Sequence, residues 1–218
     1  MRTSAQSAGE RSAARRLLLA CGVMGPLLNM VVILILGAAR PDYNAWKIPD
    51  SNLELGEGGW IQITNYIVCG ALLLGFAFGL RQVLRTGRTS TWGPILLGLY
   101  GLTFIGAGIF VTDPVMGYPP GASDTTTFHG TLHSLFGQLQ FISLTAACFV
   151  LARRDATAPQ RRGWAWYSRA TGLLVALSDV IFILAFQLNG PAGLIERIGI
   201  IGGCCWIALL AIRLISRI

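Results

Sequence analysis

The stretch RRLLLACGVMGPLLNMVVILILGAAR (residues 15–40) contains one long apolar run, 17–38, between arginines. A helix of about 20 apolar residues is long enough to cross the hydrocarbon core of a bilayer. The run is therefore predicted to be a membrane-spanning helix. The apolar part of a cleaved signal sequence is shorter, so we expect this segment to be retained as a signal anchor.

The same pattern recurs along the chain. We expect spans at roughly 17–38, 59–80, 93–111, 128–151, 167–188 and 196–213. Of the 218 residues, 53% are hydrophobic and only 12% charged, whereas about a quarter of a soluble domain is charged. The predicted fold is all-α, a polytopic membrane protein built as a bundle of six transmembrane helices. A single domain is expected at 15–218, after a disordered N-terminus at 1–14 rich in Ser, Ala and Arg.

The basic residues fall almost entirely on one side of this topology. With the N-terminus in the cytoplasm, 14 of the 17 Lys and Arg residues are inside, and only Arg40, Lys47 and Arg197 are outside. Cytoplasmic loops carry the excess of positive charge, so both termini are predicted to be cytoplasmic in a multi-pass protein of the inner (plasma) membrane. The net charge of +7 is therefore assigned to topology, with membrane lipids as partners and no nucleic acid.

The acidic residues show the opposite bias. Solvation of the outer loops is the simplest explanation for seven of them: Asp42, Asp50, Glu54, Glu57, Asp113, Asp124 and Glu196. Asp179 differs, because it falls near the middle of the fifth span, where a carboxyl is costly and is often functional. It is interpreted as a proton carrier, as a counter-charge for a ligand, or as a neutral carboxyl hydrogen-bonded to a neighbouring helix. Asn29, at a similar depth in the first span, is its expected partner.

The fourth span carries a polar stripe. At 100° per residue, His129, His133, Gln140 and Ser143 fall on one helix face, whereas Gln138 falls on the opposite one. Polar side chains in a span usually face the interior of the bundle. We expect this stripe to line the bundle core or a water-filled cavity.

The two histidines also suggest a metal site. His129 and His133 have the i, i+4 spacing that lets two imidazoles on one helix bind one metal ion. A tetrahedral zinc site needs further ligands, which Asp113 and either Glu54 or Glu57 could supply from the outer loops. Zinc is the one cofactor that these residues suggest. The alternative is a pair of solvated or capping histidines at a helix start.

The loop between the third and fourth spans has clear turn chemistry. Asp113-Pro114 ends the third span, because proline stops a helix. The motif GYPPG at 117–121 predicts a rigid turn. Thr126 or Thr127 is the expected N-cap of the fourth span.

Three motifs give the chain a likeness to a known family: LELG followed by GW after the first span, TDPVMGYPPG after the third, and FHGTLH at the start of the fourth. Over about 15–217 the chain resembles the bacterial membrane family catalogued as domain of unknown function 998. The resemblance implies the six-span topology, but no activity. It also implies that four residues are important: Glu54, Asp113, His129 and His133. In the family pattern a serine precedes Glu-Leu-Gly, where this chain has Leu53.

Three functions are consistent with these observations. The first is a non-enzymatic membrane protein whose outward-facing polar pocket binds a lipid or small ligand. Its candidate lining residues are Asn29, Glu54, Asp113, His129, His133, Gln140 and Asp179. The second is a metal-dependent membrane hydrolase in which His129, His133 and Asp113 are the zinc ligands. In that hydrolase Glu54 activates water. The third is a proton-coupled transporter that uses Asp179.

Overall fold

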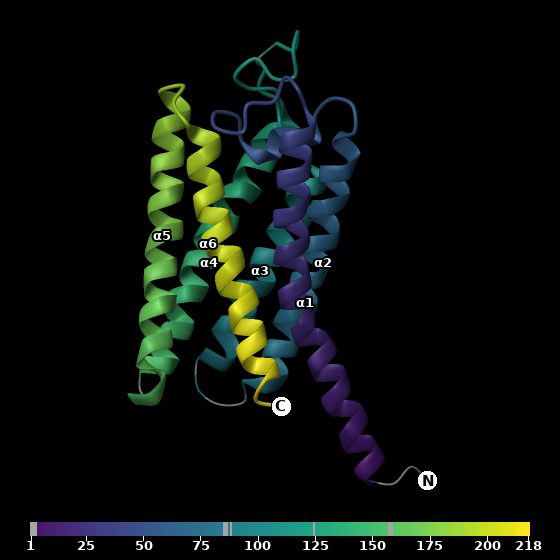
Figure 1. Cartoon of the computed structure of the whole chain (residues 1–218), viewed down its shortest axis with the longest axis vertical. Coiled ribbons are helices and arrows are strands. Elements are labelled where there is room, and N and C mark those ends of the chain that lie inside the picture. The colour runs from purple at the N-terminus through teal and green to yellow at the C-terminus, as the bar shows by residue number, and fades with distance from the viewer. Residues whose placement is uncertain (1–3, 85–86, 88, 124, 157–158) are drawn as a thin grey trace.

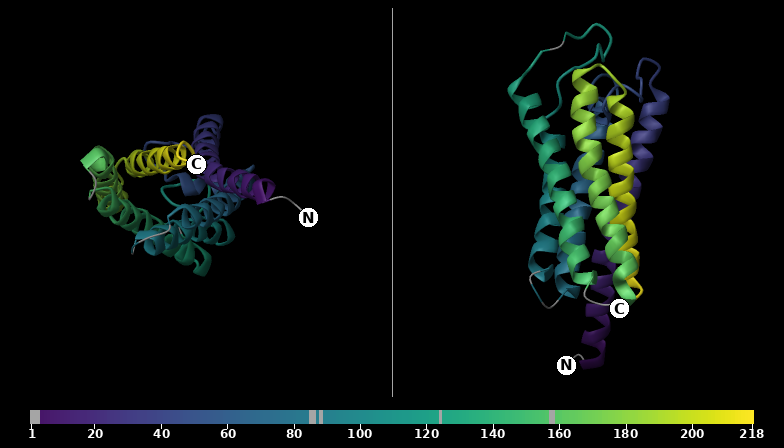
Figure 2. Two further views of the ribbon diagram at one scale, coloured as in Figure 1. Left: turned by 90° about the horizontal axis from the view of Figure 1, so that it is seen from below. Right: turned by 90° about the vertical axis from the view of Figure 1, so that its left-hand side faces the viewer.

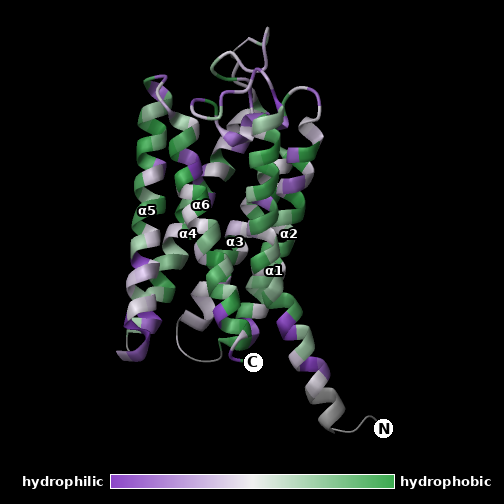
Figure 3. Cartoon of the chain, viewed as in Figure 1, coloured by the Kyte–Doolittle hydropathy of each residue, from purple (hydrophilic) through white to green (hydrophobic). Residues whose placement is uncertain are grey.

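The computed structural model describes residues 4–84, 87, 89–123, 125–156 and 159–218. Within these residues the chain forms helices and no named strand. The long helices are α1 (Ser4–Ala39), α2 (Gly59–Val83), α3 (Thr89–Ile109), α4 (Phe128–Ala156), α5 (Arg162–Gln187) and α6 (Ala192–Ile215). Two short 3-10 helices are η1 (Asp50–Glu54) and η2 (Pro159–Arg161). All six long helices are long and apolar enough to cross a membrane, and Figure 3 shows their apolar middles. The predicted all-α, six-span fold is confirmed.

The main difference from the prediction lies at the start of α1. This helix begins at Ser4, so residues 4–14, which were expected to be disordered, are helical. Ala, Glu and Arg favour helix, and extending an existing helix costs less than nucleating a new one. The polar segment therefore continues the membrane helix and projects beyond the bundle in Figure 1. Four charged residues of the predicted pattern lie outside the described residues: Arg2, Arg85, Arg88 and Asp124.

The six helices form a ring in chain order. Each packs against its neighbours along the chain, and α6 returns to pack against α1, as the end view in Figure 2 shows. The start of α1 and the end of α6 lie at the same end of the bundle (Figure 1). We call the opposite end, with the loops that join α1 to α2, α3 to α4 and α5 to α6, the cap end. That the cap end faces outward stays a prediction.

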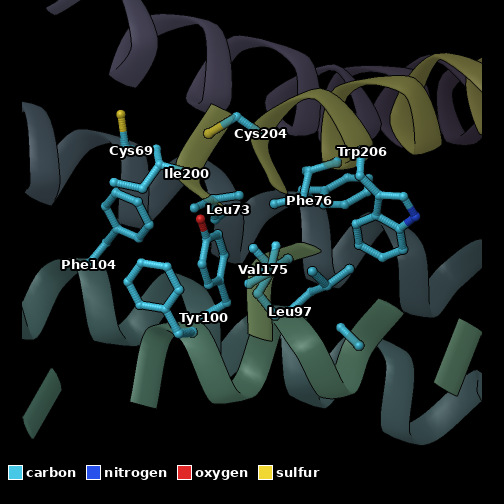
Figure 4. Close-up of a cluster of buried hydrophobic side chains, with 14 of the residues drawn as sticks. Cys69, Leu73, Phe76, Leu97, Tyr100, Phe104, Val175, Ile200, Cys204 and Trp206 are labelled. Carbon is cyan, nitrogen blue, oxygen red and sulfur yellow. The ribbon is translucent and has the colours of Figure 1, made fainter. Parts of the chain in front are cut away.

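Large apolar side chains fill much of the ring below the cap end. Figure 4 shows a cluster of them from α2, α3, α5 and α6, including Phe76, Leu97, Tyr100 and Trp206, each at most 2% exposed. The indole N–H of Trp206 donates a hydrogen bond to the Ser168 hydroxyl at 3.0 Å. A buried Trp N–H needs such a partner, so the large Trp206 side chain fills space in the ring without leaving its N–H unpaired.

Helices α2 and α3 approach closely because each places a glycine at their contact. A Cβ added to Gly70 would lie 2.6 Å from the carbonyl oxygen of Gly101, and one added to Gly101 would lie 2.9 Å from the carbonyl oxygen of Gly70. Small residues are what allow helix backbones to meet in lipid. The contact therefore leaves no room for a methyl group on either side.

We expect Gly70→Ala to destabilise the protein by about 1–3 kcal/mol, because the added methyl overpacks a contact against rigid backbone. Thermal unfolding of the detergent-purified protein, followed by tryptophan fluorescence, measures the effect. Gly98→Ala is the matched control, since a Cβ there would lie 3.7 Å from the Ala77 Cβ, an ordinary contact. Equal melting temperatures for the two variants would contradict the prediction.

Candidate functional site

The loop that joins α1 to α2 folds inward over the cap end. Its short helix η1 carries Asp50, Asn52, Leu53 and Glu54, and each of these residues is at most 4% exposed. Three of the four have polar side chains, which are costly to bury without partners. The neighbouring loops and helix ends therefore have to supply those partners.

Arg197, near the start of α6, holds this loop in place. Its Nη1 donates to the carbonyl oxygens of Ala45 at 2.8 Å, Ile48 at 3.2 Å and Gly193 at 2.8 Å. Its Nη2 donates to the Tyr43 hydroxyl. The fixed fork of donors on a guanidinium suits such a set of acceptors, so one buried side chain ties the loop to α6.

Two helices that begin at the cap end have a glycine where the loop passes. A Cβ on Gly59, the first residue of α2, would overlap the carbonyl oxygen of Glu54, and a Cβ on Gly193 of α6 would overlap that of Ile48. Loop backbone thus occupies space that a side chain would otherwise take. The loop can lie directly on these two helix starts only because both residues are glycine.

Between the loop and the ring lies a cavity of about 270 Å³. All six helices and η1 contribute to its wall. Polar side chains of the wall include Asn29, Asp50, Asn52, His133, Gln138, Gln140 and Glu196. Its aromatic side chains are Tyr66, Phe104, Phe141, Phe182 and Phe186. A concave, mostly apolar site with a few converging polar groups is the usual form of a small-molecule site.

His133 lines this cavity with one ring nitrogen committed to the protein. Its Nδ1 lies 2.9 Å from the carbonyl oxygen of Phe110 and 3.1 Å from that of Ala107. Both partners are acceptors, so Nδ1 carries the proton and, in the neutral ring, Nε2 is an acceptor. Glu54 Oε2 lies 3.5 Å from the same Nδ1, which places a carboxyl beside the imidazole.

Glu54 is buried and only half satisfied. Its Oε2 accepts a hydrogen bond from the Thr112 N–H at 3.0 Å, whereas its Oε1 is buried with no partner in the described structure. Burial raises the pKa of Glu54 to about 8, against the opposing effect of the Thr112 hydrogen bond and with a smaller increase from the charge of Asp50. The folded protein therefore holds Glu54 largely protonated at neutral pH.

This raised pKa predicts a pH-dependent stability. Between the ordinary value of 4.5 and about 8 the folded state binds more protons at Glu54 than the unfolded state does, so stability is highest below this window and falls as the pH rises through it. Melting temperatures in detergent from pH 5 to 9 should show the fall, and Glu54→Gln should make it less steep.

Glu57→Gln is the control for this prediction, because Glu57 is an exposed carboxylate in the same loop. That variant should keep the slope of the unmodified protein. A Glu54→Gln variant that loses stability as steeply as the unmodified protein between pH 5 and 8 would show that another group is responsible.

Asp50 and Glu196 bring two carboxyl groups together in the cavity wall. The backbone N–H of Asp50 donates to Glu196 Oε2 at 2.7 Å, and both side chains line the cavity. Loop solvation was the expected reason for the outer acids, and it is wrong for Asp50, Glu54 and Glu196, which are 2%, 4% and 7% exposed.

Asp113 has a structural role at the start of α4. Its carboxylate accepts hydrogen bonds from the Thr127 backbone N–H at 2.8 Å and the Thr127 hydroxyl at 2.6 Å. The Thr127 hydroxyl oxygen in turn accepts from the Gly130 N–H at 3.0 Å. Thr127 is therefore confirmed as the N-cap. Gly130 has no Cβ, and the Asp113 carboxylate occupies the space that one would need.

The predicted zinc ligands are not brought together. Among the described residues, no group of three or more His, Cys, Asp and Glu side chains could hold a metal ion. His129 is exposed on the first turn of α4, its ring 5.5 Å from that of Phe110. The i, i+4 spacing places His129 and His133 on one helix face, one turn apart. The His129 ring is nevertheless exposed, whereas the His133 ring is buried against α3. Asp113 is occupied with the cap.

The polar groups within the spans pair differently from the prediction. Asn29 lines the cavity and accepts a hydrogen bond from the Asn65 amide at 2.9 Å. Asp179 is partly exposed, lies outside the cavity wall, and accepts from the Gln138 amide at 3.2 Å. The expected pairing of Asp179 with Asn29 is therefore wrong. Gln140 lines the cavity, and so does Gln138, because the wall extends around the flank of α4 toward α5.

Sequence reasoning missed the Asp50–Glu196 pair. The available signal was the adjacent Glu196-Arg197 at the start of the last span, an acid and a base where most neighbours are apolar. Each of them contacts the first loop, about 150 residues away along the chain. Neither periodicity nor hydropathy contains that long-range contact.

Six apolar helices around a capped cavity define a polytopic integral membrane protein. The chain belongs to a family described as protein of unknown function (DUF998), whose family model matches residues 23–213. This match confirms the family resemblance seen in the sequence motifs. Comparison with curated proteins and with solved structures gives no match.

Proposed function

We propose that this protein binds a small amphipathic ligand, a lipid or a lipid-like molecule, in the cavity at the cap end. The observation that carries the proposal is the composition of the cavity wall. Five aromatic side chains face the same space as the Asp50–Glu196 pair and His133. An apolar body with one polar head matches such a wall.

The position of the cavity supports the same proposal. Lower in the ring, large apolar side chains such as those of Trp206 and Phe76 are fully buried between the helices. At the cap end the helices instead surround a space of about 270 Å³ that can accept a ligand.

A cavity-filling variant tests the proposal. Gly137 on α4 lines the cavity, and a Cβ added there would have no atom within 4 Å. Gly137→Leu should therefore fold normally and occupy part of the space. Native mass spectrometry of protein extracted in mild detergent should show a co-purified species whose occupancy falls at least about tenfold in this variant, since roughly 1.4 kcal/mol of lost affinity is tenfold.

Gly163→Leu is the matched control. Gly163 is an exposed helical glycine near the start of α5, also with no atom within 4 Å of an added Cβ, so this variant should retain the species. If the bound species are identical in both variants and the unmodified protein, ligand binding in this cavity is contradicted.

One observation favours hydrolysis as a second candidate. Glu54 lies beside His133 Nδ1, and the acceptor Nε2 belongs to a ring that lines the cavity. A histidine placed in this way can act as a general base toward a hydroxyl or water. Lipid extract incubated with the protein should then yield products that His133→Ala does not form; equal product profiles would remove this candidate. Asp179 lies outside the cavity wall, and no comparable observation favours a proton-coupled transporter.

A further inference from the structure

We propose, building on the proposed ligand-binding function, that the ligand carries a cationic head group, an alkylammonium or quaternary ammonium, which lies against Asp50 and Glu196. The charges of the wall lead to this inference. Asp50 and Glu196 both line the cavity, and none of its described lining residues is Lys or Arg. An anionic head group would meet carboxyl groups and no cation.

The nearest guanidinium is engaged elsewhere. Arg197 follows Glu196 in the chain, but it donates to Ala45, Ile48, Gly193 and Tyr43 on the loop side and is not part of the cavity wall. Its positive charge offsets at most one of the two carboxylate charges. A cationic head group can therefore match a carboxylate charge that Arg197 leaves without a counter-charge.

A second observation also calls for a donor from the ligand. His133 is 6% exposed and lines the cavity, and its Nδ1–H is committed to Phe110 and Ala107. Its Nε2 is thus an acceptor, and no hydrogen bond to this atom occurs within the described residues. An acceptor without a donor at a cavity favours a ligand that brings N–H or O–H groups.

The aromatic part of the wall suits the same head group. Tyr66 and Phe104 lie edge to face with ring centroids 5.6 Å apart, and Phe141, Phe182 and Phe186 complete the aromatic lining. The faces of aromatic rings attract ammonium groups, and cages of such rings bind quaternary ammonium ligands. The same rings provide an apolar surface for an alkyl chain.

Three probes of equal chain length test the charge. Hexylamine, hexanol and hexanoate differ at pH 7 only in the head group, which is cationic, neutral or anionic. Binding of each to the full-length protein in a neutral detergent is measured by titration calorimetry. Hexylamine should bind at least about tenfold more tightly than hexanol, as expected for a buried charge pair, and hexanoate should bind most weakly.

Variants locate the selectivity. Asp50→Asn and Glu196→Gln should each bring hexylamine affinity close to that of hexanol, while hexanol binding, which reports an intact cavity, stays unchanged. Glu57→Gln, an exposed carboxylate of the same loop, should keep the full preference. A preference that survives both cavity variants would contradict the assignment to Asp50 and Glu196.

The results also separate this inference from the function on which it rests. If the unmodified protein binds the three probes equally, and Gly137→Leu weakens all of them, the cavity binds ligands but the charge inference is wrong. If none of the probes binds and Gly137→Leu retains every co-purified species, both proposals fail. Tighter binding of hexanoate than of hexylamine would overturn the charge inference alone.

Discussion

The hydrogen bonds of Arg197 are the contact on which the cap end depends. A buried acceptor that loses its donor costs about 1–3 kcal/mol, and this guanidinium serves four acceptors at once. By tying the first loop to α6 it fixes η1, and η1 carries both Asp50 and Glu54. The same anchor therefore sets the position of the carboxyl pair and of the carboxyl beside His133. The hydrogen bonds from Thr112 to Glu54 and from Asp50 to Glu196 complete the attachment of the loop.

The ring explains why a cavity exists in so small a protein. Between helices in lipid there is no hydrophobic driving force, and close packing through small residues takes its place. Gly70 and Gly101 provide such a contact between neighbours in the ring. Helices that pack only against neighbours leave an axial space, which Trp206 and Phe76 fill in the lower part. At the cap end that space is bordered by polar and aromatic side chains and is closed by the loop instead.

Local signals in the sequence predicted some features of the site, and long-range contacts determined the others. The spans follow from hydropathy because lipid requires it, and Thr127 follows from cap chemistry. Helical periodicity placed His133 and Gln140 toward the interior, where both line the cavity. It also placed His129 toward the interior, but His129 is exposed. Periodicity gives the angle of a residue around a helix and does not show whether neighbouring helices extend to that height. The Asp50–Glu196 pair depends on how loop and helix meet, which no local pattern encodes.

The order of helices in the ring has a consequence for biogenesis. Helices α1 to α5 can associate one after another as they enter the membrane, since each meets the helix made just before it. Of the helix–helix packings that form the ring, the α6–α1 contact joins the most distant parts of the chain, and it closes the ring. Glu196 and Arg197 arrive on α6, so the hydrogen bonds of these two residues with the first loop form only after the other five spans have been made. A chain truncated before α6 would keep five spans and lack the part of the cavity wall that Glu196 and Ile200 supply.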